Sequence, residues 1–130
     1  MILLQPLTIT TALTAYLGPV YTPPKFQSVT LECIFSYGSG GTSMNCWVQT
    51  SLDDTEWQDV VNFEATTESL ITFYNLSTLT PKTTAVAHSD GSLSANTSTD
   101  GILCGFWRTK ITTVGTYAGG TILQINALFR

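Results

Sequence analysis

The chain has 130 residues and a formal net charge of −4; 43% of its residues are hydrophobic and only 11% are charged. Soluble domains usually carry about a quarter charged residues, and here Thr and Ser, roughly a quarter of the chain, supply most of the polarity. The basic residues are scattered and no apolar stretch approaches the roughly 20 residues of a membrane-spanning helix, so we expect neither nucleic-acid binding nor membrane association.

Residues 1–24 form an apolar segment that prolines and a glycine interrupt. It lacks the basic start and the continuous apolar run of a signal peptide. Leucines and tyrosines exposed there would be unfavourable in a free monomer. We therefore expect the segment either to pack back as an edge strand or to dock on a neighbouring subunit. The anchors for docking would be Leu3, Leu4, Leu7, Tyr16, Leu17 and Tyr21.

From residue 25 onward, apolar and polar residues alternate with a period of two, which indicates β-strands, and no stretch predicts a helix. The clearest strand covers 28–36. A glycine-rich turn at 37–42 and a strand at 44–50 follow, and we expect the two strands to form a hairpin. The second strand puts Trp47 on its polar face, where it could be exposed and contact a partner.

Further strands are expected around 60–63, at 69–76, near 83–87, at 105–114 and at 121–129, with a polar surface loop at 88–100. A possible strand near 7–13 brings the total to about eight. This number and spacing predict an all-β fold, an antiparallel β-sandwich or jelly roll with an extended N-terminal segment. We expect two parts, a docking segment at 1–24 and a β-sandwich domain at 25–130.

The cysteines are Cys33, Cys46 and Cys104, an odd number at spacings that match no metal motif. We expect three buried, reduced thiols. A disulfide between Cys33 and Cys46 on neighbouring strands is the alternative.

A search for catalytic groups finds one histidine, His88, in the polar loop, with no separated partners for a triad. The acidic residues Asp53, Asp54, Glu56 and Asp59 gather around one turn and are expected to form a charged rim. A calcium site at three of them, Asp53, Asp54 and Asp59, is the less favoured alternative. We therefore expect no enzyme activity, no metal and no cofactor.

Residues 51–57 (SLDDTEW) resemble the Asp-box turn, S-x-D-x-G-x-T-W, without its glycine. In such a turn the Asp side chain accepts hydrogen bonds from backbone N–H groups. The Trp packs beneath the turn, so this resemblance predicts a structural role for Asp53 and Trp57.

Four segments resemble a group of proteins in order and spacing: FSYGSGGT at 35–42, VQTSLD at 48–53 with Trp57 and Phe63, DGIL at 100–103, and GTYAGGT at 115–121. From about residue 25 to its end, the chain resembles the small structural proteins encoded in the morphogenesis regions of tailed bacteriophages and prophages. The turn at 54–56, where that group tends to carry glycines, departs from the pattern.

This resemblance implies a virion protein that is assembled in the host bacterial cytoplasm and forms a homo-oligomer, with a trimer favoured. The leading hypothesis is a capsid decoration (cement) protein that binds the major capsid protein. One alternative is a neck or tail protein, which would serve in head completion, the tail tube or the tail tip. Another is a carbohydrate-binding module for host attachment that uses Trp47 or Trp57.

Overall fold

The computed structural model describes the whole chain, Met1–Arg130, and its regular elements are all β-strands. In chain order they are β1 (Ile2–Thr8), β2 (Tyr16–Leu17), β3 (Ser28–Ser36), β4 (Ser39–Gly40), β5 (Ser43–Ser51), β6 (Gln58–Ala65), β7 (Leu70–Ser77), β8 (Thr97–Ser98), β9 (Phe106–Val114), β10 (Tyr117–Ala118) and β11 (Ile122–Phe129). No helix is present that could cross a membrane.

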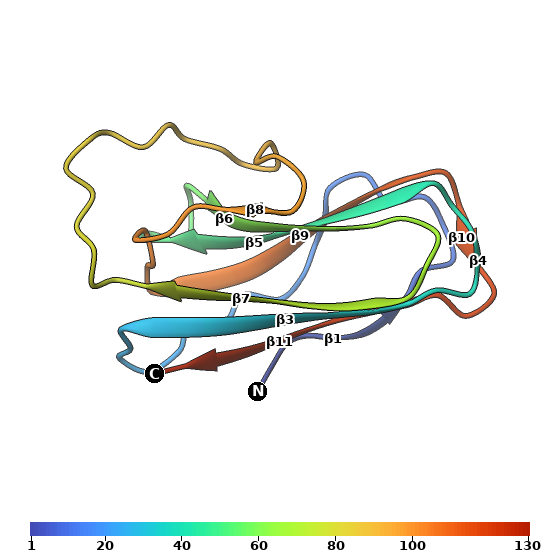
Figure 1. The fold of residues 1–130 in the computed structure, drawn as a ribbon, viewed down its shortest axis with the longest axis horizontal. Helices are drawn as coiled ribbons and strands as arrows, with labels where there is room; N and C mark the ends of the chain where they lie inside the picture. The colour runs from blue at the N-terminus through green and yellow to red at the C-terminus, as the bar shows by residue number, and fades with distance from the viewer.

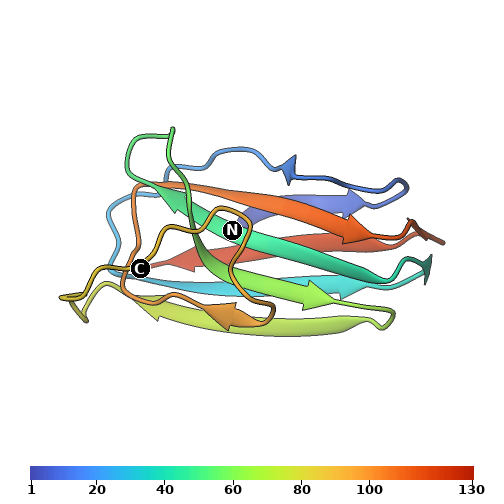
Figure 2. The same ribbon diagram turned by 90° about the horizontal axis from the view of Figure 1, so that it is seen from above.

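The strands form two antiparallel sheets that pack face to face (Figures 1 and 2). Sheet A has the order β1-β11-β3-β7, and sheet B has the order β2-β9-β5-β6-β8, while β4 and β10 pair at one end of the sandwich. If the short strands β4, β8 and β10 are left out and the remaining eight strands are numbered 1 to 8 along the chain, sheet A has the order 1-8-3-6 and sheet B has the order 2-7-4-5. This order is that of a jelly roll, so the predicted fold class is confirmed.

The predicted hairpin between residues 28–36 and 44–50 is wrong, because the two strands lie in different sheets. β3 pairs with β11 and β7, whereas β5 pairs with β6 and β9. The glycine-rich turn carries the chain from sheet A to sheet B, with Gly40 and Gly41 at positive φ angles of 70° and 67°. Alternation identifies the apolar face of each strand but not its neighbours. Two strands bury their apolar faces in the same core whether they pair in one sheet or lie in two sheets on opposite sides of that core.

The core lies between the sheets and consists of the side chains that alternate along the strands. The apolar faces predicted for β3 and β5 are fully buried, at Val29, Leu31, Cys33, Phe35, Met44, Cys46 and Val48. Aromatic rings fill the rest of the space and meet edge to face. Phe35 contacts Tyr117 with 5.6 Å between ring centroids, and Phe63 contacts Tyr74 at 5.3 Å.

The three cysteines are free thiols, so the Cys33–Cys46 disulfide is not formed. Cys33 and Cys46 are both buried in the core, on strands of opposite sheets. Cys104 is only partly buried, so the expectation of three buried thiols is wrong for this residue. Burial, with a smaller contribution from the charge of Glu32, raises the pKa of Cys33 to about 12. Burial also raises the pKa of Cys46, and both groups behave as small apolar side chains.

Residues 1–24 pack back on the sandwich, which is the first of the two alternatives predicted for them. β1 pairs with β11 along one edge of sheet A, and Leu3 and Leu4 are only 2% and 4% exposed. Two consecutive residues point inward because the register of β1 shifts between Ile2 and Leu4. The chain then crosses to sheet B, where β2 pairs with β9. The segment therefore supplies strands to both sheets, and the expected division at 24/25 is not a boundary between separate parts.

We predict that Leu4→Ala lowers the free energy of unfolding by about 2–4 kcal/mol, because the truncation leaves a cavity in the core. The matched control is Ile2→Ala on the same strand, where the side chain is 40% exposed and the loss should stay below about 1 kcal/mol. Urea denaturation of both variants measures the difference. Equal losses would contradict the packing of β1.

Candidate functional site

The long segment between β7 and β9, residues 78–105, covers part of the outer face of sheet B, over β5 and β6 (Figure 1). The strand predicted near 83–87 is absent, because those residues are exposed and meet no partner strand. Only β8 is regular, pairing with Val61 and Asn62 of β6. As a result β5 is buried on both faces from Cys46 to Ser51. The predicted loop at 88–100 is a cover that packs against the sheet.

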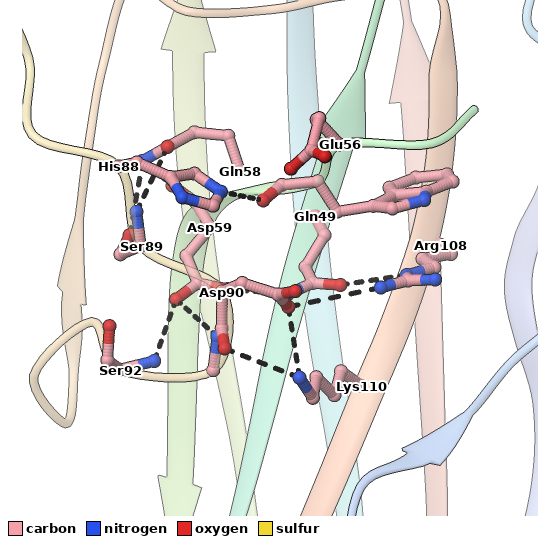
Figure 3. A network of polar contacts seen from close by, with 12 residues as sticks. Gln49, Glu56, Gln58, Asp59, His88, Ser89, Asp90, Ser92, Arg108 and Lys110 are labelled. Carbon is pink, nitrogen blue, oxygen red and sulfur yellow. Dashed lines mark hydrogen bonds and ion pairs between the residues drawn. The ribbon is translucent and has the colours of Figure 1, made fainter. Parts of the chain in front are cut away.

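A buried carboxylate fastens this cover. Asp59 of β6 is inaccessible to solvent, and its two oxygens accept hydrogen bonds from the backbone N–H groups of Gly91, Ser92 and Leu93 at 2.8–3.1 Å (Figure 3). The side chain of Gln49 donates a further bond of 2.8 Å. Gly91 has a φ of 82°, which turns successive N–H groups toward one anion. Such bonds offset the cost of burying the charge.

Gln49 joins this carboxylate to a second one, Asp90. Its Nε2 group donates to Asp59 and also to Asp90 at 2.6 Å, while its Oε1 atom accepts from Nε of Arg108 at 2.8 Å. Lys110 donates to Asp90 at 3.0 Å, and the guanidinium of Arg108 lies 3.9 Å from the same oxygen. The adjacent basic residues of β9 thus hold the loop from the side opposite Asp59, as Figure 3 shows.

The Asp90 carboxylate stays charged in this setting. Burial alone would disfavour the charge, but the hydrogen bonds from Gln49 and Lys110 and the charges of Lys110 and Arg108 outweigh it and lower the pKa of Asp90 below its usual value. The side chain of Asp90 is 38% exposed, so its ion pairs are screened by solvent and their net contribution to stability is small.

The two tryptophans expected to be available to a partner are covered. Trp47 is only 9% exposed, and its indole N–H donates to the carbonyl of Leu93 in the covering loop at 3.0 Å. Trp57 is 4% exposed, and the guanidinium of Arg108 lies 4.2 Å from its ring centroid. The expectation that Trp47 could be exposed is therefore wrong, because residues distant in the sequence cover its face of β5.

The turn at 51–57 has the structural role predicted from its Asp-box likeness. Oδ1 of Asp53 accepts hydrogen bonds from the backbone N–H groups of Thr55 and Glu56, both at 2.9 Å, and from the hydroxyl of Ser51. The bonds from Glu56 and Thr55, followed by that from Ser51, lower the pKa of Asp53. Asp54 occupies the left-handed region at a φ of 60°, one residue before Thr55, which stands where the Asp-box pattern has its glycine.

A cavity of about 270 Å³ lies beside this turn. Its walls come from the turn itself, from Trp57 and Gln58, and from three parts of the covering segment: Val86, His88, and the pair Ile102 and Cys104. The imidazole Nε2 of His88 donates to the carbonyl of Trp57 at 2.8 Å, which holds the wall in place. The cavity thus lies where the covering segment meets the end of sheet B.

The residues around the cavity do not form a recognisable catalytic set. Asp53 is committed to its own turn, and His88 bonds a backbone carbonyl with no carboxylate behind it. Burial raises the pKa of Cys104, so its thiol is not activated as a nucleophile. No group of three or more His, Cys, Asp or Glu side chains is placed to hold a metal ion. Asp59 binds loop amides while Asp53 faces its own turn, so the calcium alternative finds no converging ligands.

The structure separates the docking residues predicted from the sequence into three kinds. Leu3, Leu4 and Trp47 are buried and are not surface anchors. Leu7 and Tyr21 are partly buried against the core, and Tyr21 also forms backbone hydrogen bonds with Trp107. Tyr16 and Leu17 of β2 are exposed at 41% and 49%.

The network of Gln49, Asp59, Asp90, Arg108 and Lys110 was missed from the sequence. One signal was available: Trp47 and Gln49 alternate on the outer face of β5, as Arg108 and Lys110 do on β9, and the structure pairs Gln49 with Arg108 and Trp47 with Lys110. The attachment of residues 90–93 carries no such signal, because the ligands are backbone N–H groups.

Comparison of the chain with protein-family models, with curated proteins and with solved structures finds no match. None of the three links the chain to phage structural proteins, so that resemblance stays a prediction.

We predict that Asp59→Asn lowers the free energy of unfolding by about 2 kcal/mol or more, because the amide cannot accept hydrogen bonds at both positions and leaves buried N–H groups unpaired. Asp54→Asn, on the exposed turn, is the control and should change stability by less than about 0.5 kcal/mol. Urea unfolding gives the free energies, and limited proteolysis should show earlier cleavage within 88–93 for Asp59→Asn alone. An Asp59→Asn protein as stable as the control would refute the fastening role.

The lowered pKa of Asp90 predicts how the contribution of this residue to the free energy of unfolding changes with pH. The charged form is favoured in the folded state, so its stabilising effect is present above the usual value of 3.8 and is lost as the pH falls through the lower folded pKa. We expect wild type to exceed Asp90→Asn in stability at neutral pH by less than about 1 kcal/mol, since the group is partly exposed. The gap should close below pH 3.8. Urea unfolding at a series of pH values measures it, and a gap that widens in acid would contradict this assignment.

Proposed function

We propose that this chain is a non-enzymatic virion structural protein of a tailed bacteriophage, and within that class a capsid decoration protein. In this role it binds the major capsid protein on the outside of the head lattice and acts as a homo-oligomer. Its place would be the virion, after assembly in the host bacterial cytoplasm. Jelly rolls are an architecture of viral capsid and lectin domains, which supports the proposal at the level of the fold. A fold alone does not give a function, so the surface must carry the argument.

The observation that carries the proposal is an apolar strip on the edge of sheet B. Tyr16, Leu17 and Val20 are 41%, 49% and 48% exposed and follow one another along β2 and the residues after it. The backbone is held firmly, because Gly18 and Tyr21 donate hydrogen bonds to the carbonyls of Thr109 and Trp107. Apolar side chains presented on a fixed edge are typical of a protein-binding surface. We infer that this strip, and not the buried Leu3 and Leu4, contacts the capsid.

The surface chemistry is consistent with a purely binding role. A decoration protein works by repeated contacts of modest strength, which multivalency adds up over a lattice. A net charge of −4 on a Thr-rich surface opposes non-specific self-association while the protein stays soluble. The carbohydrate-binding alternative loses its support, since Trp47 and Trp57 are covered and offer no open ring face for a sugar.

The test uses particles of the phage or prophage that encodes the chain. We expect particles that lack the protein to assemble and then to lose their DNA at a lower temperature than complete particles. Quantification of the protein in purified particles should give hundreds of copies. Six or twelve copies per particle would indicate a neck protein, and copies confined to the tail would indicate a tail protein. Either result would overturn the decoration role.

We further predict that Leu17→Lys reduces the occupancy of added protein on depleted particles by about tenfold or more, because it places a charge in the apolar strip. Leu52→Lys is the matched control, since Leu52 is 83% exposed on the turn after β5 and lies outside the strip. Sedimentation of particles with bound protein measures occupancy. Equal binding of the two variants would remove the strip from the interface.

A further inference from the structure

The four edges of the two sheets differ in how they are protected from pairing with another chain. β2 and β8 are only two residues long, and β1 contains Pro6 and an irregular register. Short edges, proline and bulges are the usual means of blocking edge-to-edge association. β7 has none of them. It is eight residues long, regular in its pairing with β3, and free of proline and charge.

The direction of the hydrogen bonds along β7 follows from its neighbours. Ser28 of β3 exchanges both backbone bonds with Arg130, so the even residues of β3 bond to β11. Gln27 accepts from the N–H of Thr78, so the odd residues of β3 bond toward β7. Through the register of the pair, residues 70, 72, 74 and 76 of β7 bond to β3. The N–H and C=O groups of the odd residues of β7 therefore point away from the sheet.

One of these outward positions is already occupied. The N–H of Ser77 donates to the Asp100 carboxylate at 2.8 Å, which closes that end of the edge. The open positions are Ile71, Phe73 and Asn75, and β7 pairs with no strand other than β3. The side chains of Ile71 and Phe73 are 60% and 61% exposed, and Phe73 borders a shallow hollow of about 190 Å³ on the outer face of sheet A.

We propose that β7 pairs with β7 of a second copy of this chain, antiparallel and across a twofold axis at Phe73. Phe73 then lies opposite Phe73 of the other copy, and Ile71 lies opposite Asn75 on either side. Each of the three residue pairs exchanges two backbone hydrogen bonds, which makes six. The two sheets A become one continuous sheet of eight strands.

A second copy fits this edge better than an unrelated strand for two reasons. The unpaired backbone N–H and C=O groups lie at residues 71, 73 and 75, evenly about Phe73. A twofold rotation at Phe73 therefore places each N–H of one copy opposite a C=O of the other. The pairing also brings the four exposed side chains of Ile71 and Phe73 together on one face, where cross-strand and diagonal apolar contacts form. No charged residue lies between Glu68 and Lys82, and Glu32, which stands beside Phe73, is on β3, one strand back from the edge. Two chains of net charge −4 therefore meet along β7 without like charges directly opposed.

This pairing differs in symmetry from the trimer favoured from the sequence, because an antiparallel strand pair is twofold. It does not depend on the virion role and can be tested on the purified chain alone. Sedimentation velocity of the wild-type protein should show a dimer at about 100 µM. Phe73→Lys places like charges directly opposite and should raise the dissociation constant at least about tenfold.

The matched control is Leu128→Lys, which replaces a side chain 46% exposed on the same outer face but away from the edge, and it should remain dimeric. Asn75→Pro removes an outward N–H and keeps the backbone bonds between β7 and β3, although it also removes the bond that Nδ2 of Asn75 donates to Oγ1 of Thr30 at 2.8 Å. It should also weaken the dimer. A wild-type protein that is monomeric at about 100 µM or trimeric would overturn the proposal. So would a dimer that tolerates both edge substitutions.

Cysteine cross-linking tests the register in a Cys104→Ser background. Residues that exchange both bonds across an antiparallel pair have Cα atoms about 5.5 Å apart, within reach of a disulfide. Under mild oxidation Phe73→Cys should give a covalent dimer, because residue 73 faces itself. Ile71→Cys should not, because it faces Asn75. The reverse pattern would exclude the proposed axis.

Discussion

The buried carboxylate of Asp59 is the interaction on which much of this structure depends. β5 and β6 are each buried on both faces: the inner face packs against the core, and the outer face lies beneath residues 78–105. A long segment without regular structure packs there only if its backbone groups find partners. Asp59 binds three successive N–H groups at 91–93, and Gln49 extends this network to Asp90 and to β9. The outer face of sheet B is thereby buried at β5 and β6, while the outward residues of β9 stay partly exposed.

This cover decides which surfaces are left for binding. It hides the aromatic rings of Trp47 and Trp57, so sheet B presents no flat apolar face to a ligand. The exposed apolar side chains include those of the strip around Leu17 on one edge of sheet B and, on sheet A, those of Ile71 and Phe73. Two separate apolar edges on one small domain fit a protein that contacts a partner and its own copy at once, as repeated assembly requires.

The sequence predicted the fold class and the core faces because both depend on local alternation. Val29 to Phe35 and Met44 to Val48 are buried as expected. Strand partners could not be predicted in this way: the same alternation is compatible with a hairpin and with two opposed layers, and only the wider topology distinguishes them. The two alternatives for Leu4 stayed undecided, and the burial of Trp47 was mispredicted, for a related reason. Their burial depends on residues about 120 and 46 positions away, on β11 and at Leu93.

Amide hydrogen exchange of residues 91–93 in the native protein tests the central claim most directly. These three residues lie in a loop, and without Asp59 their N–H groups would exchange as fast as those of exposed loops. If the carboxylate fastens the cover, Gly91, Ser92 and Leu93 exchange as slowly as the core strands β5 and β6, whereas Ser94 exchanges quickly. Rapid exchange at all four residues would show that the segment is not held on the sheet and would contradict the account.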